Sequence, residues 1–311
     1  MATPDLARGA QPLVRLRAER RRYGEDVVKG VLALCALVSV ATTLGIVIAL
    51  LEPAIEFFRE VSLADFFGGT DWAPLFEPAR FGVLPLLGGT FNVVLWACLV
   101  CIPFGLGAAI YLSEYARPRV RKILKPALET LAGIPTVVFG FFALTAFTPF
   151  LQELGIDVGV FNALSAGIVI GVMLIPVVAS ISEDAMAAVP QELRDGAYGL
   201  GASRLQVATR IVVPAAISGI VASFVLAVSR AVGETMIVLI AAGGIAQLTL
   251  DPREPVQTMT AFIGATGIGD VPTGSIEYKT IFAVGLTLFC LTLVMNVFAI
   301  RLVRKYREIY E

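Results

Sequence analysis

Long apolar runs separated by short charged segments dominate the hydropathy pattern of the chain. Runs of more than about 18 apolar residues predict helices that cross a bilayer. Six such spans are predicted, at residues 27–51, 83–112, 126–150, 161–181, 214–244 and 280–303. The pattern therefore predicts an all-α integral membrane protein with six transmembrane helices.

The third apolar run is interrupted by Gly133-Ile134-Pro135. A proline leaves one helix carbonyl without its hydrogen bond, and a membrane tolerates this only where other protein or a polar cavity satisfies the group. Gly133 and Pro135 are therefore predicted to break the helix beside such a partner.

Positive charge is distributed unevenly between the predicted loops. With the N-terminus inside, the cytoplasmic segments carry 19 of the 24 Lys and Arg residues, and the external segments carry four. The remaining cation is Arg230. This bias predicts both termini in the cytoplasm. The predicted organisation is a basic tail (1–26), a first helix with an external segment (27–83), a core (84–303) containing a cytoplasmic loop (182–213), and a second tail (304–311).

Composition excludes several classes of protein. Hydrophobic residues make up 57% of the chain, above the roughly 45–50% of a soluble domain. The chain has no histidine and no P-loop, and its four cysteines lie within apolar runs, where they are expected to pack as small core residues. We therefore expect no metal or cofactor on this chain, and any ATP hydrolysis on another one.

The polar loop before the fifth span has the pattern of two short helices joined at a glycine. Pro190 suits the first turn of a helix, because its missing N–H has no partner there. Gly201 suits a helix end, since glycine readily adopts the left-handed conformation. Ser203 and Gln206 have the spacing of a capping box. Periodicity alone leaves an ordinary amphipathic connector as an alternative.

The fifth span carries two charged residues within an apolar run. Arg230 lies roughly 24 Å beyond Pro214 at ~1.5 Å per residue, which is near mid-bilayer. A charge there costs at least about 2.5 kcal/mol on insertion scales, and Glu234, four residues on, is predicted to share its face and pair with it. The pair is either a structural lock between helices or a substrate-path cation held by its acid. Candidate hydroxyl donors on the same path are Ser229, Thr235 and Thr136.

The spacing of the loop residues resembles the EAA loop of ABC-importer permeases. That loop reads E-A-A, three residues, G, nine residues, I-x-L-P, whereas this chain has Asp195-Gly196-Ala197, Gly201 and Ile211-Val212-Val213-Pro214. The resemblance implies a coupling helix that sits in a cleft of an ATPase subunit. The coupling residues it implies are Glu192, Leu193, Asp195, Gly196, Ala197, Gly201 and Pro214.

Further stretches, from about residue 84 to the end, are similar to the C-type (PstC-type) permease of high-affinity phosphate ABC importers. They are residues 109–115 (AIYLSEY), 131–140 (LAGIPTVVFG), 230–235 (RAVGET), 258–263, 278–285 and 307–310. The resemblance implies the type I, MetI-like permease fold and import of inorganic phosphate across the bacterial cytoplasmic membrane.

The same resemblance implies a set of partners. They are a sister permease (PstA-type), two copies of an ATPase (PstB-type) that hold ATP and Mg²⁺, and an extracytoplasmic phosphate-binding protein (PstS-type). The lipid bilayer surrounds the spans, and no nucleic acid is expected.

Other functions fit parts of the same pattern. A permease for sulfate, molybdate or another oxyanion would use the same architecture. A proton-coupled secondary transporter would use Glu234 as its proton carrier, and it would work without an ATPase. A sensory membrane subunit is a further alternative, although the sequence contains no signalling module.

Overall fold

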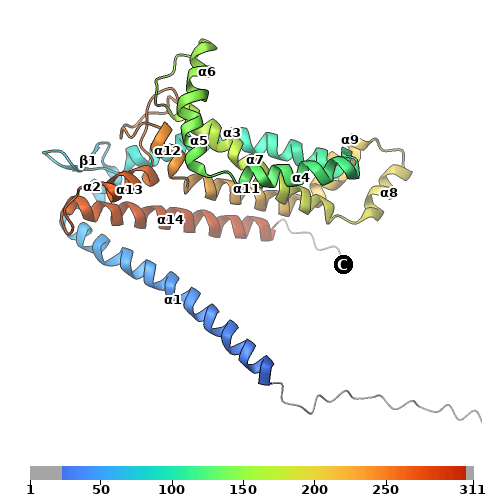
Figure 1. The fold of residues 1–311 in the computed structure, drawn as a ribbon, viewed down its shortest axis with the longest axis horizontal. Coiled ribbons are helices and arrows are strands. Elements are labelled where there is room, and N and C mark those ends of the chain that lie inside the picture. The colour runs from blue at the N-terminus through green and yellow to red at the C-terminus, as the bar shows by residue number, and fades with distance from the viewer. Residues whose placement is uncertain (1–22, 306–311) are drawn as a thin grey trace, which may run out of the picture. The chain divides into compact units, whose positions relative to one another are not determined.

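Helices make up most of residues 23–305, the part of the chain that the computed structural model describes (Figure 1). The longer ones are α1 (Tyr23–Glu60), α3 (Leu84–Ile110), α4 (Pro118–Ala132), α7 (Ala163–Ala187), α11 (Ile217–Val232) and α14 (Ile276–Lys305). Shorter helices are α2 (Leu63–Gly68), α5 (Thr136–Phe142), α6 (Thr148–Glu153), α8 (Gln191–Gly199), α9 (Arg204–Val207), α10 (Val213–Ala215), α12 (Met236–Ala241) and α13 (Met259–Ile268). Three π-helical turns are η1 (Tyr111–Tyr115), η2 (Ala143–Phe147) and η3 (Ala208–Val212).

The chain divides into two units, residues 1–49 and 50–311, and α1 runs through the boundary. In the first unit the described side chains of α1 are almost all exposed in this chain. Most of the two predicted tails, including the 307–310 stretch, lies outside the described residues.

The prediction of six spans is confirmed. Five described helices are long and apolar enough to cross a membrane, and the number is six when the bent pair of residues 204–215 and 217–232 is counted as one span. The bend between its halves is 73°. It falls at Ala216, just after Pro214, because a proline cannot donate the hydrogen bond that would continue a regular helix.

Several predicted boundaries are wrong, and two of them affect the site. The first helix continues to Glu60, beyond its predicted end at residue 51, so the predicted external segment begins as a helix. The fourth span continues to Ala187, six residues beyond the predicted end, because ion pairs hold its polar last turns. The predicted fifth span, residues 214–244, contains two separate helices, α11 and α12, because the chain breaks at residues 233–235.

The core of the second unit is centred on α7, which packs along α3 and also contacts α11. Buried residues of all three helices form one apolar cluster, which includes Val93, Ala97, Ile170, Leu174 and Ala227. A Cβ atom at Gly105 would lie 2.6 Å from Val178 Cβ, and one at Gly171 would lie 2.7 Å from the Ala97 carbonyl oxygen. Glycine is therefore required where these two helices approach most closely.

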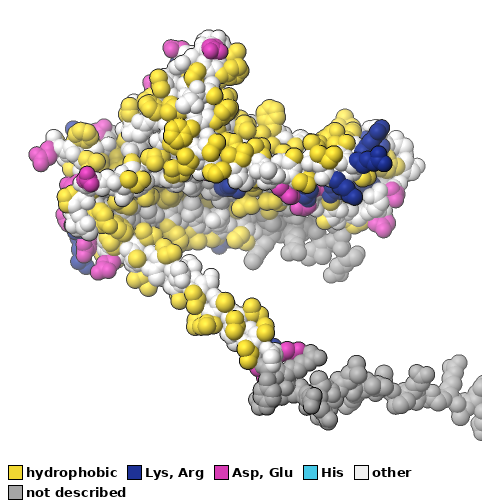
Figure 2. Space-filling model, viewed as in Figure 1, with side chains coloured by type: hydrophobic (Ala, Val, Ile, Leu, Met, Phe, Trp, Pro, Cys, Tyr) yellow, Lys and Arg dark blue, Asp and Glu magenta, His cyan; other side chains and the backbone are white. Residues whose placement is uncertain are grey.

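The third predicted span begins in the wrong place, although its break is confirmed. Residues 118–132 form a separate amphipathic helix, α4, and the candidate span is residues 136–153. Arg121 and Lys125 of α4 form ion pairs with Glu183 of α7, whose side chain is fully buried; Lys125 Nζ lies 2.7 Å from the Glu183 carboxylate. Lys125 also pairs with Asp184. Lys and Arg side chains gather around this end of the second unit (Figure 2).

A short hairpin lies at the other end of the second unit, between α2 and α3. Its strands, β1 (Trp72–Ala73) and β2 (Arg80–Phe81), are antiparallel, with Trp72 opposite Phe81. Phe57, Phe66 and Trp72 pack edge to face beneath it, and Trp72 contacts Phe262 of α13 with ring centroids 4.9 Å apart. These aromatic contacts fix the hairpin against α13.

Candidate functional site

The loop after α7 folds as the two short helices that its sequence predicts. Pro190 is the N-cap residue of α8, and Gly201 has a φ of +81° directly after that helix. The Ala202 N–H donates to the Ala197 carbonyl across this turn, at 3.1 Å. Ser203 and Gln206 form the capping box of α9. The left-handed turn at Gly201 therefore sets the direction in which α8 and α9 diverge.

Most of α8 is exposed in this chain. The side chains of Glu192, Leu193 and Asp195 are exposed, as is Gly196, whereas Ala197 is half-buried. Leu200, at the C-terminal end of the helix, is 91% exposed. The Gln191 amide donates to the Asp195 carboxylate at 3.1 Å, within the surface of the helix. The face that the sequence assigns to coupling is thus available to another chain.

One residue of α8 is buried and was not among the predicted coupling residues. The Arg194 guanidinium donates to the Val189 carbonyl at 2.6 Å and to the Met186 carbonyl at 2.8 Å. It also lies 3.2 Å from the carboxylate of Glu114 in η1, and both side chains are at most 10% exposed. The position of Arg194 directly before the Asp195 triplet was the signal in the sequence for this contact. Its partner Glu114 lies 80 residues earlier in the chain, so the pairing itself could not be predicted.

Helix α11 connects this loop to the charged residues of the fifth span. One face of α11 packs on α7, where Ser182 and Ser223 share a hydrogen bond of 2.8 Å between their hydroxyl groups. The buried residues of this face are Ile220, Ser223, Ala227 and Ala231. This face of α11, which carries small residues, is thus a packing face.

Arg230 lies beside this packed face and not within it. Its side chain is exposed in this chain, and in the described part of the chain its guanidinium has no hydrogen-bond or ion-pair partner. The neighbouring Ser229 donates to the amide oxygen of Asn296 in α14 at 2.9 Å. Among the described residues, this permanent cation is therefore unpaired in an apolar part of the chain.

Glu234 does not pair with Arg230, contrary to the sequence-based expectation. Because α11 ends at Val232, the two residues are not one turn apart on one helix. The Glu234 carboxylate instead accepts from the backbone N–H groups of Met236 at 3.1 Å and Ile237 at 3.3 Å. Glu234 is 8% exposed, so it satisfies orphan donors at the start of α12 inside the protein.

Two broken helices meet beside this position. Helix α4 ends at Ala132, and α5 begins at Thr136 after Gly133 and Pro135, as predicted. Helix α5 packs on α12, since a Cβ atom at Gly140 would lie 2.9 Å from Ile240 Cδ1. Thr260 of α13 donates to the Glu234 carbonyl at 2.7 Å and holds the second break in place.

The predicted hydroxyl donors are not drawn into one cluster. Thr235 donates to the Gly233 carbonyl at 3.2 Å, within the break. Thr136 is half-buried at the start of α5, and no hydrogen bond links it to residues 229–235 in the described structure. Within residues 23–305 no cluster of His, Cys, Asp or Glu side chains is arranged to hold a metal ion.

A broken, charged membrane helix next to an exposed loop with EAA spacing identifies the type of protein. The family model for inner membrane components of binding-protein-dependent transport systems matches residues 102–308. The chain belongs to this family. It is therefore a multi-pass membrane permease subunit of an ABC importer and does not itself carry the ATPase chemistry.

Relatives cover nearly the whole chain. The probable ABC transporter permease YqgH of Bacillus subtilis is 36% identical over 93% of this chain and 94% of its own length. The phosphate transport permease PstC of Haemophilus influenzae is 28% identical over 91% of this chain and 94% of its own. PstC 1 of Mycobacterium tuberculosis is 32% identical over 77% of this chain and 81% of its own. The predicted resemblance to PstC-type permeases is confirmed.

Solved structures confirm the fold. A chain of a bacterial ABC transporter for alginate import superposes with a TM-score of 0.61 at 16% identity, over 93% of this permease and 100% of that chain. A chain of the methionine transporter MetNI gives 0.53 at 18% identity, over 73% and 95%. The chain therefore has the MetI-like type I permease fold.

Proposed function

We propose that this permease carries inorganic phosphate across the bacterial cytoplasmic membrane, as one subunit of an ATP-driven importer. The observation that carries the proposal is the guanidinium of Arg230, which is unpaired within residues 23–305 and lies beside the broken helix. The relatives of this permease include phosphate permeases. Guanidinium offers a planar, permanently charged donor set that matches phosphate oxygens.

Arg230 serves as the substrate-path cation in this proposal. With Glu234 occupied by backbone N–H groups of α12, the full charge of the arginine is available to a passing anion. A passage must also release its ion, and a single exposed cation binds an anion more weakly than an enclosed cage would. Ser229, Thr235 and Thr136 are the proposed hydroxyl donors along the same route.

The proposed orientation places both termini and α8 in the cytoplasm. The asymmetry of Lys and Arg between the loops supports it. In this orientation the exposed face of α8, with Glu192, Leu193 and Asp195, docks on a PstB-type ATPase that holds ATP and Mg²⁺. A PstA-type permease completes the passage, and a PstS-type binding protein delivers phosphate from outside.

Uptake of labelled phosphate at low external concentration tests the substrate. Cells lacking this chain are complemented with the wild-type gene and challenged with excess sulfate and molybdate. We expect phosphate uptake that neither anion inhibits and that stops when cellular ATP is depleted. Competition by sulfate or molybdate would identify another oxyanion as the substrate, and uptake driven by a proton gradient without ATP would indicate a secondary transporter.

A further inference from the structure

A groove of about 740 Å³ lies between η1, the turn that follows it, and one side of α4. Its apolar lining residues are Leu112, Ala116, Pro118 and Pro126. The groove is at the C-terminal end of the candidate span Leu84–Tyr115. The end of a membrane span lies at the depth of the lipid headgroups. The groove is therefore placed where protein, water and lipid meet.

The charges along this groove are only partly balanced within the chain. Arg121 and Lys125 line it, but both are paired with acidic residues of α7. Lys122 also lines it, and its exposed side chain has no hydrogen-bond or ion-pair partner in the described part of the chain. Arg117 and Arg119, at the start of α4, are likewise exposed and unpaired within residues 23–305. Three uncompensated cations thus lie at the groove or directly before it.

The spacing along α4 keeps these cations apart from the acid of the groove. Arg119 and Lys122 are three residues apart, so their side chains are neighbours on the helix surface. Glu129, which also lines the groove, lies seven residues beyond Lys122, and this is roughly 10 Å along the helix at ~1.5 Å per residue. One end of the groove is therefore basic, and that end attracts an anion.

The rest of α4 adds apolar surface next to the cations. Ile123 is 69% exposed and Leu124 is 38% exposed, and no residue of this described helix is buried. Such a helix is stable when its cations lie among headgroups and its apolar side chains lie among acyl chains. Inorganic phosphate would use the cations alone, whereas a phospholipid uses the cations and the apolar surface together.

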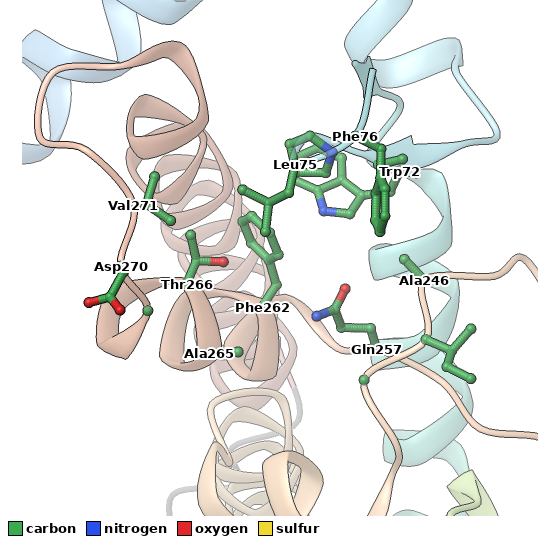
Figure 3. A pocket seen from close by; sticks show the side chains of 15 residues that line it. Trp72, Leu75, Phe76, Ala246, Gln257, Phe262, Ala265, Thr266, Asp270 and Val271 are labelled. Carbon is green, nitrogen blue, oxygen red and sulfur yellow. The ribbon is translucent and has the colours of Figure 1, made fainter. Parts of the chain in front are cut away.

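A cavity of similar size at the other end of the second unit differs in charge. It measures about 690 Å³ and lies between the hairpin and α13 (Figure 3). Its walls include Trp72, Phe76 and Phe262, and Asp270 is the charged residue among the described residues that line it. An anionic headgroup would be repelled there. Apolar space alone therefore does not distinguish the α4 groove, whereas its unpaired cations do.

We propose that the α4 groove binds the headgroup of an anionic phospholipid, with the lipid phosphate beside Arg119 and Lys122 and the acyl chains along the apolar side chains of α4. A basic groove at the end of membrane helices is a typical site for such a headgroup. The excess of Lys and Arg in this segment supports the cytoplasmic leaflet as its location. The site requires the membrane and not the transported ion, so it goes beyond the proposed function and does not depend on the substrate.

The test uses the full transporter complex, purified in detergent and titrated with phosphatidylglycerol or with zwitterionic phosphatidylcholine. Native mass spectrometry counts the bound lipid and shows whether the complex is intact. We expect wild type to bind phosphatidylglycerol at least tenfold more tightly than phosphatidylcholine, and the preference should fall as salt is raised, because the cations are exposed. The double variant Arg119→Gln/Lys122→Gln should lower the affinity for phosphatidylglycerol about tenfold, to that for phosphatidylcholine.

The matched control is Arg204→Gln/Arg210→Gln, which removes the same charge from exposed positions outside the groove. Its affinity for phosphatidylglycerol should stay within about twofold of wild type. Equal affinity for this lipid in wild type and in Arg119→Gln/Lys122→Gln would overturn the inference. Displacement of the lipid by millimolar inorganic phosphate would overturn it in favour of a site for the free anion. Loss of the ATPase from Arg119→Gln/Lys122→Gln would assign these cations to a protein contact instead.

Discussion

Arg194 Nη2 in α8 lies 3.2 Å from Glu114 Oε1 in η1, so a buried ion pair joins the coupling loop to the end of α3. The same guanidinium holds two carbonyls at the end of α7 and the turn that follows. Any force that another chain applies to the exposed face of α8 therefore reaches two core helices through one side chain. This arrangement makes Arg194 a positioning residue for the proposed coupling to an ATPase.

Arg194→Gln is expected to separate ATPase binding from transport. Removing one partner of a buried pair costs about 3–5 kcal/mol of local stability, whereas the exposed face of α8 keeps its side chains. The ATPase should still copurify, its hydrolysis should no longer respond to the binding protein, and uptake should fall more than tenfold. Glu114→Gln should give the same phenotype. Arg204→Gln, at an exposed position of α9, is the control, and wild-type coupling in Arg194→Gln would contradict the role.

Arg230→Gln is expected to abolish phosphate uptake while the complex assembles normally. The guanidinium has no partner in the described chain, so its removal leaves no buried group unpaired. Arg230→Lys keeps the charge without the planar donor set, and should retain part of the uptake with weaker apparent affinity. Uptake and the yield of intact complex are measured together. Loss of assembly in Arg230→Gln would favour the structural interpretation of this arginine.

Glu234 is expected to act through the backbone of α12. Glu234→Gln keeps an oxygen that can accept from the Met236 and Ile237 N–H groups, and should leave the melting temperature of the complex nearly unchanged. Glu234→Leu leaves both donors unpaired, at about 1–3 kcal/mol for each buried group, and should lower that melting temperature by several degrees. Equal melting temperatures for the two variants would rule out the capping role.

The parts of this fold that depend on local pattern could be predicted from the sequence. Span lengths follow from apolar runs, and the turn at Gly201 and the capping box at Ser203 follow from residue types a few positions apart. Contacts that join distant segments could not be predicted. The sequence alone places Glu183 in a loop. In the structure its side chain is fully buried, because it pairs with Arg121 and Lys125, about 60 residues earlier in the chain.

The candidate site shows the same limit. Helical spacing predicted that Glu234 pairs with Arg230, but the break at Gly233–Thr235 is stabilised by Thr260, 26 residues later. Once the helix is broken, the spacing of four residues no longer implies a shared face. The position of Arg230 as a charged residue of the fifth span could be found from the sequence, whereas its lack of a partner could not.

Gly201 offers a test in which the backbone alone is changed. Its φ of +81° is costly for most residues, about 1–2 kcal/mol, whereas asparagine tolerates it. The space around Gly201 is open, so added bulk meets nothing within this chain. Gly201→Leu should redirect α8 and release the ATPase from the purified complex, whereas Gly201→Asn should retain it. If both variants lost the ATPase, side-chain bulk at the interface would be responsible, and if both retained it, the left-handed turn would have no part in coupling.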